Sequence, residues 1–433
     1  MSLPNILYIH SHDTGRYVQP YGHAVSTPRL QRLAGEGVLF RQAFSAGPTC
    51  SPSRACLLTG QCAHTNGMLG LAHRGFGLYD YSRHILHTLR KAGYFSALAG
   101  VQHIAGGTEA AWKTIGYDRY LGEPSVADEQ ACAFLDNAPA QPFFLSVGFT
   151  ETHREYPRRH PDENPDHGLP PAPIPDAPET REDMARFKAS ARILDRKIGR
   201  VLDALDKNGL AEDTLVICTT DHGIAFPRMK CNLTDGGIGV MLILRGPRGF
   251  SVGRVCDALV SHIDVFPTVC DWLGIEPPDW LQGVSIMPHI RGDTDHVREE
   301  IFAEVNYHAA YEPMRCIRTR RWKYIRRFDG RSRPVLPNCD DSPSKTLLLD
   351  CGWGEMALPE EALYDLVFDS HETHNLAAEP RAQAALADLR ARLGAWMRDT
   401  DDPLLAGPVQ APPGAIVNNP DGRSPTEKDY VAV

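Results

Sequence analysis

Hydrophobic residues in this chain gather in short runs that each end abruptly in polar residues. Residues 5–10 form the first run, which breaks into the polar segment 11–15, and the same pattern recurs later in the chain. Uninterrupted apolar runs of this length are typical of β-strands buried on both faces. The pattern therefore predicts strands at 5–10, 94–100, 142–149 and 214–219.

Amphipathic stretches between these runs predict helices at 27–35, 85–92 and 184–208. Strands that alternate with helices indicate an α/β fold with a mostly parallel, doubly wound central sheet flanked by helices on both faces. In such sheets, ligands bind at the carboxyl ends of the strands. The four predicted strand ends lead to polar groups, namely His12-Asp13, His103, His153 and Asp221-His222.

The pattern changes in the later part of the chain. A proline-rich segment at 157–178 predicts an irregular loop that overhangs the site, because proline cannot donate to a sheet or sit inside a helix. After about residue 310, a strand hairpin at 314–325 precedes a helix at 380–400. We therefore predict a larger domain, 1–310, and a smaller C-terminal α+β domain, 311–433, with a small antiparallel sheet, one helix and an extended tail. The tail from 402 onward either wraps an existing surface or is mobile.

Composition and charge narrow the class of protein. The 433 residues are 42% hydrophobic and 23% charged, as in ordinary globular proteins. The net charge is −9, and the basic residues are scattered, so we expect no nucleic-acid partner. No apolar run approaches the roughly 20 residues of a membrane span, and the first ten residues lack a secretory signal. We expect a cytoplasmic protein without a membrane partner, although a trimmed leader is compatible with this start.

The eleven cysteines are an odd number and lie mostly in apolar runs, which favours reduced, buried thiols over a disulfide framework. The sequence has no CxxC zinc pattern. Cys50 differs from the others: it lies in the turn-rich segment 48–54, ahead of a helix predicted from residue 55. This setting makes Cys50 a candidate for chemistry.

The polar groups at the strand ends could together hydrolyse a charged ester, which needs a nucleophile, a cationic clamp and an acid. Each residue taken singly has a more ordinary interpretation, such as a structural histidine or a helix-capping aspartate. Their convergence at one sheet edge favours a site. Asp13 and Asp221, with His12 or His222, suit one divalent cation; Arg54 and Lys230 are candidate anion clamps; His103 and His153 are candidate proton carriers.

The segment Cys50-Ser51-Pro52-Ser53-Arg54, followed by Thr59-Gly60, matches the type I sulfatase signature C-x-P-S-R with a downstream T-G. Further matches cover almost the whole chain: 4–7, 27–38, 220–223, Lys230 with 235–238, and 363–377. The chain therefore resembles the formylglycine-dependent sulfatases. Segments 64–68, 221–227 and 371–376 are most similar to the heparan N-sulfatase, or sulfamidase, branch.

This resemblance implies an alkaline phosphatase-like fold, with residues 1–310 as the catalytic domain. It implies that a maturation enzyme oxidises Cys50 to formylglycine, whose hydrate attacks sulfur and whose second hydroxyl then expels sulfate. Arg54 would hold this residue, and Lys230 would bind the sulfate oxygens. His103 would handle the hydrate proton, and His153 would serve the leaving group.

The resemblance also implies one divalent metal ion and a sulfated substrate. Asp13, Asp221 and His222 match metal-ligand positions, with residue 50 as a further ligand. The substrate would be a sulfate ester or sulfamate on a small molecule or saccharide. Its specificity would come from loops such as 154–178 and the region around 307–308. The oligomeric state, including a homo-oligomer, stays open.

Two positions depart from the family pattern. Most sulfatases have Asp-Asp where this chain has His12-Asp13, and a lysine where it has Val101. If His12 is a ligand, its imidazole favours Mn²⁺ or Zn²⁺ relative to Ca²⁺. If His12 points away, a Ca²⁺ or Mg²⁺ site remains.

The absence of a lysine at position 101 makes a second activity possible. Without this positive charge, a dianion-like transition state is destabilised more than the transition state for hydrolysis of a monoanionic diester. A phosphonate monoester or phosphodiester hydrolase on the same scaffold is therefore an alternative. A catalytically silent binding protein is a third interpretation. The joint presence of Cys50, Arg54, His103, His153 and Lys230 argues against it.

Overall fold

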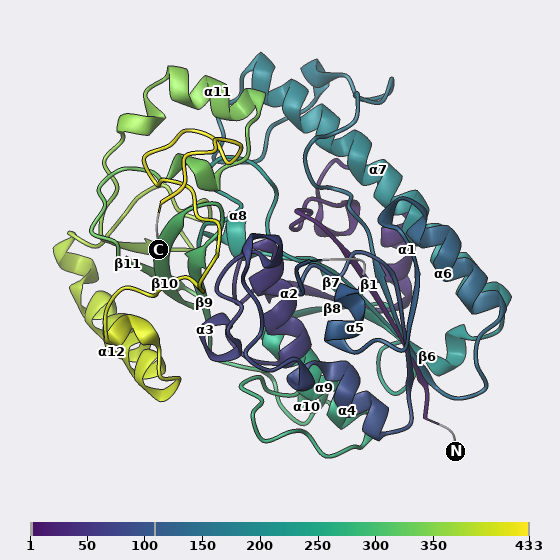
Figure 1. Cartoon of the computed structure of the whole chain (residues 1–433). Coiled ribbons are helices and arrows are strands. Elements are labelled where there is room, and N and C mark those ends of the chain that lie inside the picture. Colours follow the sequence, from purple (N-terminus) through teal and green to yellow (C-terminus); the bar gives the residue numbers. More distant parts are fainter. Residues whose placement is uncertain (1–2, 108–109, 432–433) are drawn as a thin grey trace.

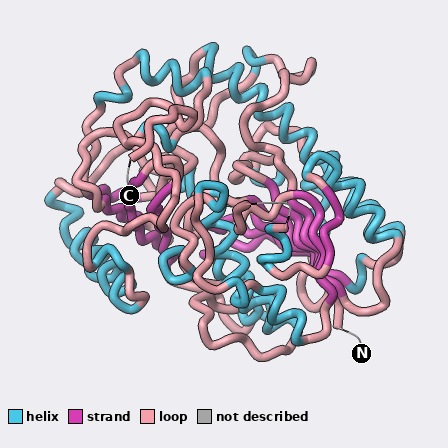
Figure 2. Tube along the Cα trace, viewed as in Figure 1, coloured by secondary structure: helices cyan, strands magenta, loops and turns pink. Residues whose placement is uncertain are grey.

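Two β-sheets organise the protein, which we describe from a computed structural model covering residues 3–107 and 110–431. Figure 2 shows the strands of the larger sheet running through the main body, with the smaller sheet beside them. Helices lie on both sides of the larger sheet (Figure 1).

The larger sheet has the strand order β4-β3-β5-β1-β6-β7-β2-β8. Neighbouring strands are parallel except at β7, which runs antiparallel to β6 and β2. The mostly parallel sheet predicted from the sequence is confirmed. Its strands are β1 (Asn5–Ser11), β2 (Val38–Phe44), β3 (Phe95–Gly100), β4 (Arg119–Gly122), β5 (Phe143–Gly148), β6 (Thr214–Thr220), β7 (Leu242–Arg245) and β8 (Arg254–Ser261).

Helices cover both faces because successive side chains of each strand point to opposite sides. In β1, Leu7 and Ile9 pack toward α1 (Pro28–Glu36), α6 (Ala127–Asp136) and α7 (Pro178–Lys207). Ile6 and Tyr8 pack toward α2 (Cys50–Thr59), α4 (Ile85–Lys91), α9 (Val265–Leu273) and α10 (Met287–Arg291). Further helices of the chain are α3 (Ala63–Asn66), α5 (Ala111–Ile115), α8 (Asp235–Ile238) and α11 (Pro343–Asp350). Within the described residues, no helix is long and apolar enough to cross a membrane.

The smaller sheet is antiparallel, with the order β12-β11-β10-β9. One face is covered by α12 (Gln383–Asp399), whose Leu386, Leu389 and Leu393 join the same apolar cluster as Ile317 and Leu363. The opposite face packs against the main body through a second apolar cluster. The strands are β9 (Glu300–Tyr307), β10 (Tyr311–Thr319), β11 (Trp322–Arg327) and β12 (Glu361–Asp365).

Most of the predicted elements lie where the sequence placed them, with some differences at their ends. The helix predicted at 184–208 begins earlier, at Pro178, because proline is well suited to the first position of a helix. The hairpin predicted at 314–325 is formed by β10 and β11. The division at residue 310 stays a prediction; β9, which precedes it, pairs with β10, which follows it.

The C-terminal tail wraps the molecule, which decides between the two alternatives that the sequence left open. Val409 and Val417 are buried, and Nη1 of Arg74 donates to Oδ1 of Asn418 at 2.6 Å. The tail is therefore fixed by apolar burial and by hydrogen bonds to residues far away in the sequence.

Candidate active site

The site forms where the carboxyl ends of β1 and β6 meet the first turn of α2. β1 and β6 are adjacent and parallel, with Ser11 paired to Thr220 at their ends. The chain therefore places His12-Asp13 beside Asp221-His222. β3 and β5 end on the same edge of the sheet and lead to His103 and His153. The structure thus brings together polar groups that lie far apart in the sequence.

Cys50 is the first residue of α2 and is only 2% exposed. The sequence placed it in a turn ahead of a helix starting at residue 55, and this was wrong, because the helix already begins at Cys50. Its Sγ lies 3.5 Å from Nε2 of His222. Burial raises the pKa of the thiol well above its usual value, a rise that Lys230 opposes and Asp13 increases. The thiol is therefore protonated at neutral pH.

Arg54 lies one helical turn after Cys50, and both terminal nitrogens of its guanidinium contact the sheet edge. Its Nη2 donates to Oδ2 of Asp221 at 2.9 Å and to the carbonyl of Ser11 at 3.0 Å. Its Nη1 contacts Nδ1 of His10. Arg54 therefore holds the end of β1 and the Asp221 carboxylate in place beside residue 50.

Asp13 and Asp221 form a buried carboxylate pair that suits a divalent cation. The backbone N–H of Asp13 donates to Oδ1 of Asp221 at 2.8 Å. Oδ1 of Asp13 lies 3.2 Å from Nε2 of His222 without hydrogen-bond geometry, so it is a buried oxygen lacking a donor. Ligand atoms of His12, Asp13, Cys50 and Asp221 all lie within 4.8 Å of one another. The donor set fits the predicted metal ion, with oxygen ligands for a hard cation and imidazole for a softer one.

His12 is brought into this group and does not point away from it. Its Nδ1 lies 3.1 Å from Oδ2 of Asp221. Burial, together with the nearby charge of Arg54, lowers the pKa of His12 to about 4. The imidazole is therefore neutral at neutral pH, which is the form that binds metals. The pKa of Asp221 lies well below its usual value. Burial raises this pKa, but the neighbouring His222, Arg54 and His12 lower it by more.

Lys230 lies between two carboxylates. Its Nζ donates to Oδ2 of Asp13 at 3.0 Å and to Oδ2 of Asp340 at 2.8 Å. Burial lowers the pKa of Lys230, yet the two carboxylates outweigh burial and raise it well above its usual value. The sequence did not identify Asp340, which follows β11 in an irregular segment with no motif around it. His308 is also buried nearby, and burial, reinforced by the charge of Lys230, lowers its pKa well below the usual value.

His103 is held by a second histidine that the sequence also did not identify. Nε2 of His103 lies 3.1 Å from Nδ1 of His73, and the two rings stack at 5.3 Å with 8° between their planes. The His103 ring is 5.5 Å from the ring of His12. Burial, followed by the charges of His12 and Arg54, lowers the pKa of His103 well below its usual value. No sequence pattern marked His73, which lies in a 3₁₀ turn after α3.

A cleft of about 1340 Å³ opens onto the histidine side of the site. It is lined by His12, His73, His103 and His153, and by Pro157 at the start of the predicted loop. The rings of His12 and His153 meet edge to face at 5.3 Å. Nδ1 of His153 contacts the carbonyl of Arg154, so this nitrogen carries the proton and Nε2 is free to exchange one.

A comparison with protein-family models decides the family. The sulfatase model matches residues 4–275, more than half of the chain. The chain belongs to the sulfatase family. A second model, the C-terminal region of N-sulphoglucosamine sulphohydrolase, matches residues 229–344. The resemblance found in the sequence, including its branch, is confirmed, and the protein is an enzyme of the sulfuric ester hydrolase class.

Curated relatives agree with this family assignment. Human N-sulphoglucosamine sulphohydrolase is 30% identical, and the match covers 93% of this chain and 92% of that protein. Choline-sulfatase of Rhizobium meliloti is 26% identical over 90% of this chain and 85% of that protein. This sulfatase therefore aligns with such relatives along nearly its whole length.

Solved structures show the same fold. A structure described as a 2-O GAG sulfatase has a TM-score of 0.73 at 21% identity, covering 98% of this chain and 99% of that chain. Another, solved in complex with its substrate D-glucosamine-2-N,6-O-disulfate, has a TM-score of 0.70 at 18% identity, covering 93% and 99%. At these identities the similarity shows the fold alone, and it confirms the predicted alkaline phosphatase-like architecture.

Proposed function

We propose that this sulfatase hydrolyses a sulfate ester or sulfamate on a small molecule or saccharide, using formylglycine at position 50 and one divalent metal ion. The observation that carries the proposal is the buried group around Cys50, in which Asp13, Asp221 and His222 adjoin the thiol and Lys230 adjoins Asp13. Here the cysteine sulfur stands where the formylglycine oxygens would be. The relatives named as sulfatases of saccharides support the substrate class.

Formylglycine made from Cys50 by a maturation enzyme would supply a hydrated aldehyde, with one hydroxyl to attack sulfur and another to expel sulfate afterwards. A divalent cation held by Asp13, Asp221, His222 and residue 50, with His12, would supply positive charge for the sulfate oxygens. Other side chains of the site bind the sulfate anion or transfer protons.

Lys230 and Arg54 supply the fixed positive charge of the site. The Lys230 ammonium stays protonated because Asp13 and Asp340 raise its pKa. It can therefore stabilise charge that develops on the transferred sulfuryl group. Arg54 fixes the Asp221 carboxylate and thereby the ligand edge of the site.

Two histidines carry protons. His103 is neutral, and its Nδ1 is buried without a hydrogen-bond partner, so this nitrogen can take a proton from residue 50. His153 lines the cleft, and in its imidazolium form, with protons on both ring nitrogens, its Nε2 can give a proton to the departing oxygen or nitrogen. In this proposal His103 is the base for residue 50 and His153 is the acid for the leaving group.

The test is turnover by protein co-produced with a formylglycine-generating enzyme. Aryl sulfate and glucosamine N-sulfate would be compared with an aryl phosphonate and an aryl phosphodiester. We expect kcat/KM to be highest for one of the sulfur substrates. Absence of turnover on all four by fully converted protein would favour the silent binding protein instead.

The phosphorus alternative is supported by one observation, which is that Val101 lines the cleft where most sulfatases have a lysine. Val101→Lys restores that charge, and Val101→Met is a neutral control of similar length. If the missing charge sets the preference, Val101→Lys raises the ratio of sulfate to phosphodiester turnover about tenfold, and Val101→Met does not. An unchanged ratio would remove this argument for phosphorus chemistry.

A further inference from the structure

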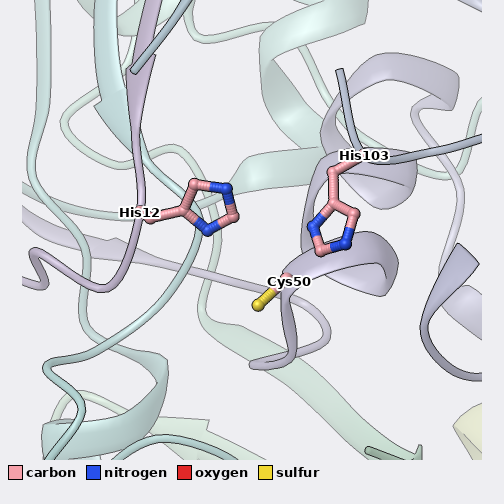
Figure 3. A group of neighbouring side chains, drawn as sticks. All are labelled: His12, Cys50 and His103. Carbon is pink, nitrogen blue, oxygen red and sulfur yellow. The ribbon is translucent and has the colours of Figure 1, made fainter. Parts of the chain in front are cut away.

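His12, Cys50 and His103 form a compact group of one thiol and two imidazoles. Figure 3 shows the two rings flanking the sulfur from different segments of the chain. One ligand atom from each lies within 4.8 Å of the others. His12 follows β1, Cys50 begins α2 and His103 follows β3, so three separate elements converge on one point.

Both imidazoles have coordination capacity that the described residues leave unused. Nδ1 of His103 is buried and has no hydrogen-bond partner, and Nδ1 of His12 lies 3.1 Å from Oδ2 of Asp221 without hydrogen-bond geometry. The other nitrogen of His103 faces His73 at 3.1 Å, in a stacked arrangement that fixes the ring. A second residue that orients a histidine in this way is typical of metal sites.

This donor set differs in kind from the carboxylate pair beside it. A thiolate and two imidazoles favour Zn²⁺ over Ca²⁺ or Mg²⁺, which prefer oxygen. Tetrahedral zinc places its ligand atoms roughly 3.4 Å apart, so each separation would shorten by at most about 1.4 Å from the 4.8 Å limit. Three protein ligands leave a fourth position for water or an anion.

We propose that the chain with Cys50 unconverted binds a thiophilic divalent cation such as Zn²⁺ through His12, Cys50 and His103. On binding, the thiol releases its proton to solvent and the sulfur lone pair forms the bond to the cation. Burial disfavours the free thiolate, so the cation itself supplies the compensating charge. Conversion to formylglycine removes the sulfur and therefore this site, which separates it from the cation site of the converted enzyme.

The test uses Co²⁺ as a spectroscopic substitute for Zn²⁺. Protein made without a maturation enzyme is checked by mass spectrometry for an intact thiol, stripped with chelator and titrated with Co²⁺. We expect a thiolate-to-cobalt absorption band in the near ultraviolet, release of about one proton per ion, and displacement by Zn²⁺. A missing band in folded protein would overturn the proposal.

Variants separate this site from the carboxylate site. Cys50→Ala abolishes the band, and His12→Asn and His103→Asn each weaken Co²⁺ binding at least about tenfold. Asp13→Asn is the matched control, because it alters the carboxylate pair and leaves the three proposed ligands; its band persists. Loss of the band in Asp13→Asn with retention in both histidine variants would instead assign the thiol to the carboxylate site.

Two further measurements keep the outcome interpretable. Circular dichroism melting shows whether each variant is folded. The variant His73→Ala removes only the side chain that supports His103, and it should weaken Co²⁺ binding about tenfold. Hydrolysis by the converted enzyme is measured separately. Because that form lacks the thiol, failure of cobalt binding and failure of the proposed hydrolysis are distinguishable.

Discussion

The ammonium of Lys230 lies 2.8 Å from the carboxylate of Asp340, a residue 110 positions further along the chain. The same ammonium lies 3.0 Å from Asp13 in the catalytic domain predicted from the sequence. The C-terminal part of the chain therefore reaches into the site and helps to hold the Lys230 ammonium in place. Asp340 acts through Lys230 and is a positioning residue.

Asp340→Asn should lower kcat/KM for an aryl sulfate about tenfold, or roughly 1.4 kcal/mol in the barrier, because Lys230 loses one of its two anchors. The pKa of Lys230 should also fall, since Asp340 helps to raise it. Asp341→Asn is the control, because Asp341 is half exposed and pairs with Lys345. Equal activities of the two variants would show that Asp340 has no such role.

Active enzyme should carry formylglycine at position 50. Conversion of the thiol to an aldehyde lowers the mass of the peptide by about 18 Da, which mass spectrometry detects. Cys50→Ser should lose nearly all turnover, because a single hydroxyl cannot regenerate itself by expelling sulfate. Cys56→Ala, in the same helix and equally buried, is the control and should stay active. Full activity from unmodified cysteine would contradict the formylglycine mechanism.

The metal preference should follow from His12, whose imidazole adjoins the carboxylate pair. After stripping with chelator, Mn²⁺ or Zn²⁺ should restore more turnover than Ca²⁺, and His12→Ala should reduce that preference. Direct cation binding by calorimetry gives a second measurement. If Ca²⁺ restores activity best and His12→Ala has no effect, His12 is not a ligand. Full activity of metal-free protein would remove the metal from the mechanism.

Acid should destabilise the fold partly through His84, a buried residue at the start of α4. Burial lowers its pKa to about 3, and its Nδ1 accepts a hydrogen bond from the backbone of Leu86 at the start of α4. The folded pKa lies below the unfolded value of about 6.5, so unfolded chains bind the extra proton first. The stability from this group is complete above pH 6.5 and is lost as the pH falls toward 3.

When the pH falls from 6.5 to 5, the contribution of His84 alone should lower the free energy of unfolding by about 2 kcal/mol. Urea unfolding at both pH values measures this, and His84→Asn, which preserves a cap, should reduce the difference by that amount. His296→Asn serves as the control: Asp295 raises the pKa of the exposed His296, so removal of His296 should not reduce the difference. Identical pH dependence in wild type and His84→Asn would contradict the prediction.

The sequence by itself determined β1, β3, β5 and β6 of the larger sheet, the hairpin of β10 and β11, and the residues grouped around Cys50. It also placed the helices α1, α4, α7 and α12. Apolar runs and the polar residues that follow them are local patterns, and the carboxyl ends of parallel strands must share one edge of a sheet. The local pattern alone therefore suffices to place Asp13, Asp221 and His222 together. The C-x-P-S-R motif added the family.

Only the tertiary structure decided what surrounds and supports these groups. Asp340 and His73 lie in irregular segments, where no periodicity reports which distant residue they contact. The helix start at Cys50 and the course of the tail depended on packing for the same reason. Long-range contacts arise from burial summed over the whole fold, whereas strand and helix patterns arise from neighbours in the chain.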